Sequence, residues 1–140
     1  MYETEQKINF RSYIEKILTK KTLIFLIHAF IGWALCGAVM KIGLATTSEM
    51  NALIIHAIAA PVFFSVISFV YYKKFGYTTP LQTAIGFTMF VILMDFFVVA
   101  PIFEQSYEMF YNPLGTWIPF LLIFISTFLT GFFQSRTVSK

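Results

Sequence analysis

Apolar side chains fill four long stretches of the chain, at residues 22–44, 51–72, 81–104 and 114–134. Each stretch has about 20 residues or slightly more, which as an α-helix is long enough to cross a hydrocarbon core of about 30 Å. The connections between the stretches are short, so consecutive helices are expected to run antiparallel and to pack against each other. The pattern therefore predicts an all-α integral membrane protein, an up-down four-helix bundle over residues 22–134.

Residues 5–21 precede the first stretch and follow a different pattern. On a helix over this segment, one face is apolar and most of the remainder is basic: Ile8, Tyr13, Ile14, Ile17 and Leu18 against Lys7, Arg11, Lys16 and Lys20. A basic amphipathic helix beside a span usually lies in the headgroup plane. We expect a separate cytoplasmic, interfacial helix over residues 1–21, with Thr4 as its N-cap, that binds anionic inner-leaflet lipid through residues 5–21. Nucleic acid, which basic segments also bind, is not an expected partner.

The basic residues divide unequally between the two ends of the predicted bundle. Of the ten Lys and Arg residues, nine lie before the first stretch, between the second and third, or after the fourth, and only Lys41 lies near the other end. The positive-inside rule then predicts cytoplasmic termini, including a short tail at 135–140, in a plasma (inner) membrane. Only 12% of the residues are charged and the mean hydropathy is +0.75, which excludes an ordinary soluble domain.

Capping signals mark where the helices begin. Thr46 and Glu49 have capping-box spacing before the second stretch, and residues 79–82 combine an N-cap, a first-turn proline and a glutamine at N3. Asn112 and Pro113 open the fourth stretch in the same way. Aromatic residues are expected to anchor both interfaces: Tyr107, Tyr111 and Trp117 outside, and Tyr13, Tyr71, Tyr72 and Tyr77 inside. Small residues four apart predict close helix packing: Gly32 and Cys36, Ala34 and Ala38, and Thr127 and Gly131.

Asp95 is the strongest functional candidate because it is a carboxylate well inside an apolar stretch. A carboxylate there costs about 2.5–3.5 kcal/mol on insertion scales. At about 1.5 Å per residue, Asp95, His56 and Cys36 all lie roughly 7–12 Å below the outer face, whereas His28 lies about 9 Å from the inner one. Prolines in the second and third stretches interrupt helical hydrogen bonding near His56 and Asp95, as happens in membrane binding sites. The alternative is structural: Asp95 accepts a hydrogen bond from His56 or from a Tyr or Trp donor and fixes the helix register.

We therefore expect Asp95 and His56 to form a binding or proton-relay pair, with Cys36, Glu104 and His28 as secondary candidates. The first interpretation is proton- or cation-coupled transport or channel-like activity. The second is a non-catalytic accessory or assembly subunit. The third is an intramembrane metal or redox site, with His56 and Asp95 as candidate ligands, or a Cys-His-Asp enzyme site. No cofactor is identified by the sequence, and so small a bundle is expected to assemble as a homo-oligomer or within a larger membrane complex.

Overall fold

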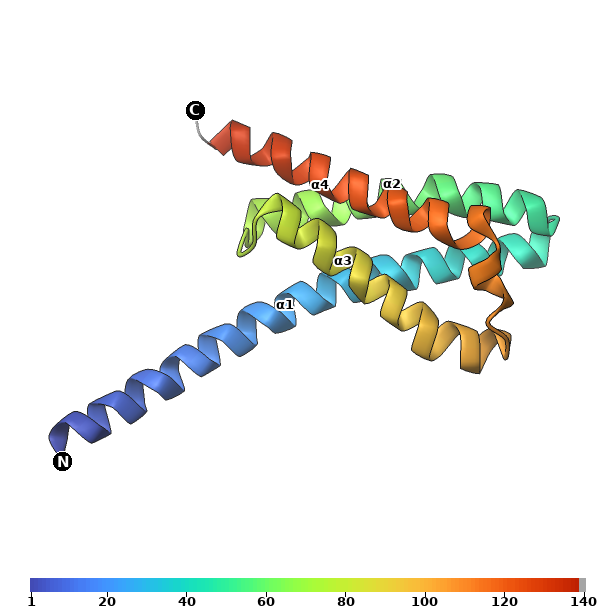
Figure 1. The fold of residues 1–140 in the computed structure, drawn as a ribbon. Coiled ribbons are helices and arrows are strands. Elements are labelled where there is room, and N and C mark those ends of the chain that lie inside the picture. Colours follow the sequence, from blue (N-terminus) through green and yellow to red (C-terminus); the bar gives the residue numbers. More distant parts are fainter. Residues whose placement is uncertain (139–140) are drawn as a thin grey trace.

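A computed structural model of the chain describes residues 1–138, and over that range the chain is helical, without strands (Figure 1). Four segments are long and apolar enough to cross a membrane: Tyr2–Thr46, Glu49–Lys74, Pro80–Glu104 and Pro113–Thr137. All four expected stretches lie within these segments. Length and composition thus agree with an integral membrane protein built as a helical bundle.

Two of the four segments change helix type along their length. The first two are regular α-helices, whereas the third passes into a π-helix and the fourth begins as one. In chain order the elements are α1 (Tyr2–Thr46), α2 (Glu49–Lys74), α3 (Pro80–Met94), the π-helix η1 (Asp95–Glu104), the 3₁₀-helix η2 (Glu108–Tyr111), the π-helix η3 (Pro113–Trp117) and α4 (Ile118–Val138).

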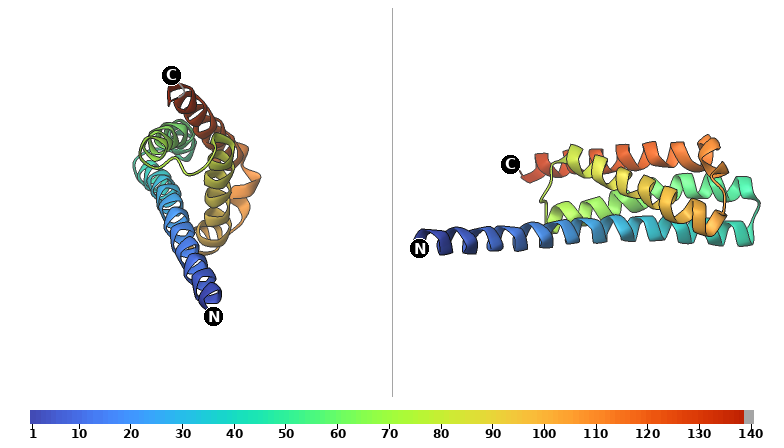
Figure 2. Two further views of the ribbon diagram at one scale, coloured as in Figure 1. Left: turned by 90° about the vertical axis from the view of Figure 1, so that its left-hand side faces the viewer. Right: turned by 60° about the horizontal axis from the view of Figure 1, so that its bottom comes forward.

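The helices alternate in direction, so the bundle has two distinct ends (Figures 1 and 2). The termini end carries the N-terminal part of α1, the C-terminal end of α4 and the connection 75–79. The distal end carries the turn between α1 and α2 and the segment 105–112. Helix α4 continues through Val138, so most of the expected tail at 135–140 is helical, and residues 139 and 140 lie outside the described residues.

The helices are not arranged in chain order around the bundle. Helix α2 packs against α1 and α4, and α3 packs against α4 and, less extensively, against α1. Consecutive α2 and α3 are therefore diagonal, which corrects the expectation that each helix packs against the next. The connection 75–79 crosses the termini end, where Gly76 adopts φ +56° and the Tyr71 and Thr83 hydroxyls both bond Thr78 Oγ1, at 3.0 and 2.7 Å.

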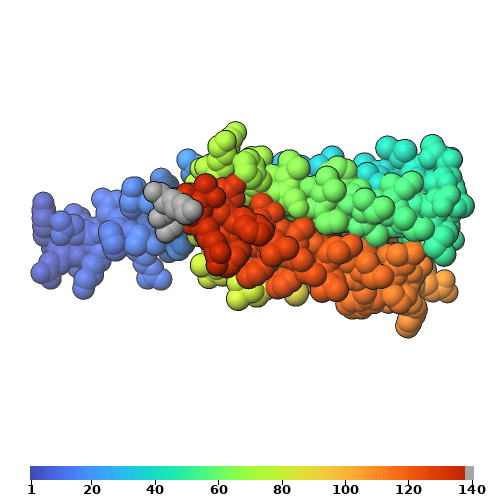
Figure 3. Space-filling view, turned by 90° about the horizontal axis from the view of Figure 1, so that it is seen from above, coloured from blue at the N-terminus to red at the C-terminus, as the bar shows by residue number. Residues whose placement is uncertain are grey.

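Residues 5–21 do not form the separate helix that their amphipathic pattern predicted. Helix α1 runs without a break from Tyr2 to Thr46, and its N-terminal part projects beyond the bundle (Figure 3). The chain has no glycine or proline before Gly32, so nothing interrupts the helical hydrogen bonds where the span was expected to begin. Thr4 is accordingly inside the helix, and the N-cap is Met1.

The later helix starts follow the capping signals with one exception. Thr79 and Gln82 form a complete capping box at α3, and Asn112 Oδ1 accepts from the Gly115 N–H at 3.2 Å at the start of η3. At α2 the N-cap is Ser48, whose hydroxyl accepts from the Asn51 N–H at 3.3 Å. Thr46, the expected cap, is instead the last residue of α1, because α1 extends two residues beyond the expected stretch.

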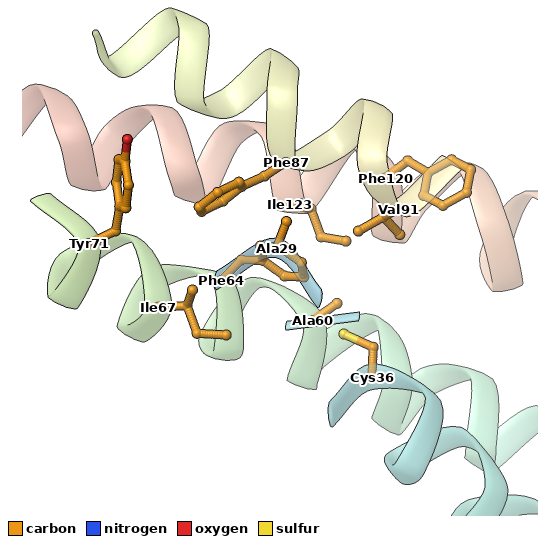
Figure 4. Close-up of a cluster of buried hydrophobic side chains, with 10 residues drawn as sticks. All are labelled: Ala29, Cys36, Ala60, Phe64, Ile67, Tyr71, Phe87, Val91, Phe120 and Ile123. Carbon is orange, nitrogen blue, oxygen red and sulfur yellow. The ribbon is translucent and has the colours of Figure 1, made fainter. Parts of the chain in front are cut away.

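The core lies between all four helices (Figure 4). Phe64, Phe87 and Ile123 are almost fully buried in it, on α2, α3 and α4 respectively. Tyr71, expected as an interfacial anchor, is also fully buried, since its hydroxyl is satisfied by Thr78. Two of the predicted small-residue seams are close contacts, with Gly32 against Phe64 and Gly131 against Tyr72; Ala34 and Ala38 are exposed.

Candidate functional site

A cavity of about 480 Å³ lies in the distal half of the bundle. Its deeper wall is formed by Trp33 and Cys36 on α1, His56 on α2, and Asp95 where α3 passes into η1. The structure thus brings together the three residues that the depth estimate placed at one level. Ligand sites in proteins typically occupy about 300–1,000 Å³, so the cavity is large enough to hold a small molecule.

The charged side chains that line this cavity are all acidic. Asp95 lies in the deeper part, and Glu49, Glu104 and Glu108 lie in segments at the distal end; no lysine or arginine is among the lining residues. The nearby Lys41 places its Nζ 5.1 Å from the ring centroid of Phe103, a residue that does not line the cavity. The three glutamates are exposed at the distal end, and a cleft lined by one sign of charge concentrates cations and repels anions.

Asp95 is held by a tryptophan. Trp33 Nε1 donates a hydrogen bond to Asp95 Oδ1 at 2.9 Å, which joins α1 to the α3–η1 junction. This is one of the donors that the structural interpretation of Asp95 anticipated. Within residues 1–138 the other oxygen, Oδ2, has no hydrogen-bond partner. One oxygen is therefore fixed in position and the second retains its full capacity to accept hydrogen bonds.

His56 lines the cavity, and the Cys36 backbone is a hydrogen-bonding neighbour of its ring. Its Nδ1 atom is buried and makes no hydrogen bond. No hydrogen bond or ion pair within the described chain joins His56 to Asp95, so the expected pair shares a cavity without direct contact. Cys36, the third member, is 4% exposed, and it meets His56 through its backbone. Within the described residues no hydrogen bond joins the Cys36 thiol to the His56 ring or that ring to Asp95.

The backbone changes its hydrogen-bonding pattern at Asp95. The Asp95 N–H still bonds back to Val91 and Ile92, as in an α-helix or a 3₁₀ turn, and the wider π pattern begins there. Because Pro101 has no N–H, a five-residue pattern leaves the Phe96 carbonyl without its helical donor. Wide turns of this kind occur disproportionately at functional sites, since they leave backbone groups free and allow local rearrangement.

The segment that covers the distal end is tied to the start of the fourth span. Thr116 Oγ1 donates to the Met109 carbonyl at 2.6 Å, and Trp117 Nε1 donates to the Phe110 carbonyl at 2.8 Å. Met109, Thr116 and Asn112 all line the cavity. These bonds fix the segment 105–112 in place as one wall of the cavity.

His28, a secondary candidate, lies outside the cavity. Its Nδ1 is 2.7 Å from the Ile24 carbonyl oxygen, and its ring packs edge-on against Tyr71 and Phe75 near the termini end. Glu104, the other secondary candidate at a helix end, does line the cavity.

Trp33 is the residue that sequence reasoning missed. It lies three residues before Cys36, on the same face of a helix and at nearly the same depth as Asp95. The available signal was that spacing, together with the indole N–H of Trp33, which needs a hydrogen-bond acceptor when it is buried.

Within the described residues no group of three or more His, Cys, Asp or Glu side chains is arranged to hold a metal ion.

No family model, curated protein or solved structure matches the chain in comparisons with known proteins.

Proposed function

We propose that this protein binds a cation in the distal cavity and couples that binding to transport across the membrane, with Asp95 as the central charge. The observation that carries the proposal is the cavity itself, whose lining residues include four acidic ones and no lysine or arginine. A carboxylate in a membrane-spanning helix is costly, and the one hydrogen bond that Asp95 accepts here comes from a neutral indole. The free Oδ2 of Asp95 is the atom we assign to the cation or proton.

The orientation that we propose places the cavity on the outer side. Nine of the ten Lys and Arg residues belong to segments at the termini end, and the positive-inside rule assigns that end to the cytoplasm. The packed residues Phe64, Phe87 and Ile123 then lie between the cavity and the cytoplasm. In this proposal the cavity is open to the outer side, and transport requires a second arrangement in which that packing opens.

The elements able to move in this way lie next to the site. Pro61 is inside α2, five residues from His56, and the π-helix η1 starts at Asp95 and contains Pro101. Prolines and wide turns interrupt the hydrogen-bond ladder and act as hinges in transporter helices. A shift of η1 would carry Asp95 with it, because Asp95 is its first residue.

Proteoliposomes loaded with a pH-sensitive dye test this proposal. With a pH gradient imposed and the membrane potential clamped, the wild-type protein should accelerate dissipation relative to protein-free vesicles, and Asp95→Asn should abolish the acceleration. Glu15→Gln is the matched control, since Glu15 is a 68% exposed carboxylate in the projecting part of α1. Equal rates for Asp95→Asn and Glu15→Gln would contradict the proposal.

The projecting part of α1 favours a second candidate, an accessory or assembly subunit. All but one of residues 1–21 are exposed, and they display both the basic and the apolar faces of the segment. Such a surface fits anionic lipid headgroups, a cytosolic protein or further copies of the chain. Spin labels at Ile14→Cys and Lys16→Cys, in a Cys36→Ser background, should both become shielded from an aqueous relaxation agent when anionic lipid replaces zwitterionic lipid. Unchanged accessibility at both positions would exclude lipid as the partner.

A further inference from the structure

The cavity combines acidic and apolar walls, and this combination restricts the class of cation that it fits. In addition to four carboxylates, it is lined by Trp33, Met40, Leu44, Leu53, Val91 and Met109. A hydrated metal ion gains no binding free energy from such side chains, because its ligands are oxygen atoms and water. An amphipathic organic cation gains binding free energy from both walls: its charge interacts with a carboxylate, and its apolar surface is removed from water.

The arrangement of carboxylates also argues against an inorganic ion. No three His, Cys, Asp or Glu side chains of residues 1–138 lie close enough together to coordinate a metal. Asp95 instead presents a single free oxygen, beside the indole of Trp33 and near the unpartnered Nδ1 of His56. One carboxylate oxygen matches one ammonium group, and an aromatic ring nearby suits a cation with an aromatic or hydrocarbon body.

From these observations we propose that the distal cavity binds a small amphipathic amine, with its ammonium group donating to Asp95 Oδ2 and its hydrocarbon body against Trp33 and the apolar wall. This rests on the proposed function, because it names the cation that the same site takes. The three glutamates draw the amine into the cavity, and Trp33 holds the carboxylate in the position that receives it. The volume of about 480 Å³ accommodates a ring with a short alkylamine chain.

Four probes of related shape separate the charge from the hydrocarbon body. Phenethylamine carries both, 2-phenylethanol lacks the charge, methylamine lacks the body, and 3-phenylpropionate reverses the charge. Binding is followed by isothermal titration calorimetry with the wild-type protein in zwitterionic nanodiscs. Phenethylamine should bind at least tenfold more tightly than each of the other three probes. Equal responses to phenethylamine and 2-phenylethanol would show lipid partition alone and would overturn the proposal without any site variant.

The site is then tested with Asp95→Asn, which should weaken phenethylamine binding at least tenfold, and with the control Glu15→Gln, which should leave it unchanged. Saturable Mn²⁺ binding that depends on Asp95, with no amine binding, would overturn the amine assignment.

The proposed transport function and the proposed amine site can be refuted independently of each other. Amine binding without Asp95-dependent flux would support this inference and refute transport, whereas Asp95-dependent proton flux without amine binding would refute this inference and leave transport supported.

Discussion

Gly32 gives the sharpest test of the packing, because the same helix provides its own control. A Cβ added at Gly32 would lie 2.6 Å from Cζ of Phe64 and 2.9 Å from both of its Cε atoms. An added Cβ at Gly37, one and a half turns further along α1, would meet nothing within 4 Å. Both changes to alanine bring the same gain in helix propensity, so the difference in stability between Gly32→Ala and Gly37→Ala isolates the steric effect.

The magnitude follows from how little Phe64 can move. Carbon–carbon contacts are optimal at about 3.5–4.0 Å, so the ring or one helix must shift by roughly 1 Å. Phe64 is fully buried and packs against Phe87 with ring centroids 6.0 Å apart, which leaves the ring no free space. Overpacking of this kind costs about 1–3 kcal/mol. At about 4 °C per kcal/mol for a chain of this size, Gly32→Ala should melt about 4–12 °C below Gly37→Ala.

The buried thiol of Cys36 supplies the assay. Cys36 is 4% exposed and is the one cysteine of the chain, so a thiol-reactive fluorogenic dye reports unfolding during a thermal ramp. Wild type, Gly32→Ala and Gly37→Ala are compared in the same detergent. Equal melting temperatures for the two variants would refute the close approach of α1 and α2 at Gly32.

Three further predictions concern the site and the topology. Trp33→Phe removes the hydrogen bond to Asp95 and should lower the free energy of unfolding by about 1.5–3 kcal/mol, the range for a bond to a charged acceptor, measured by the same thermal ramp. Asp95→Asn should shift the His56 titration midpoint measured by NMR, because both side chains line one cavity; an unchanged midpoint would mean that the two groups are not coupled. In a cysteine-free background, Glu108→Cys should react with an impermeant reagent on intact cells and Tyr2→Cys should not; the reverse pattern would invert the proposed topology.

The sequence predicted the four spans well because their ends are set by local chemistry. The capping box of Thr79 and Gln82 and the Asn112 cap are formed by residues within three positions of each other, so short-range reasoning was sufficient. The depth estimate for Cys36, His56 and Asp95 succeeded for a similar reason, since helical rise is nearly constant.

What the sequence did not predict depends on long-range contacts. The diagonal placement of α2 and α3 is set by packing among all four helices, and no local pattern encodes it. The bond from Trp33 to Asp95 joins residues 62 positions apart. The start of the π-helix at Asp95 had only the proline at 101 as an indirect signal. The continuous course of α1 through residues 5–21 was not predicted, because an amphipathic pattern indicates which face of a helix is apolar and does not indicate where the helix ends.

The uninterrupted course of α1 makes it a mechanical lever. Tyr2 and Trp33 belong to one continuous helix, and at 1.5 Å per residue the length between them is about 46 Å. If Gly32 is the fulcrum, where the helix passes against Phe64, a tilt of about 5° displaces the N-terminus by roughly 4 Å. The same tilt rotates the indole of Trp33, one residue beyond Gly32, by the same angle, and this changes the orientation of its hydrogen bond to Asp95.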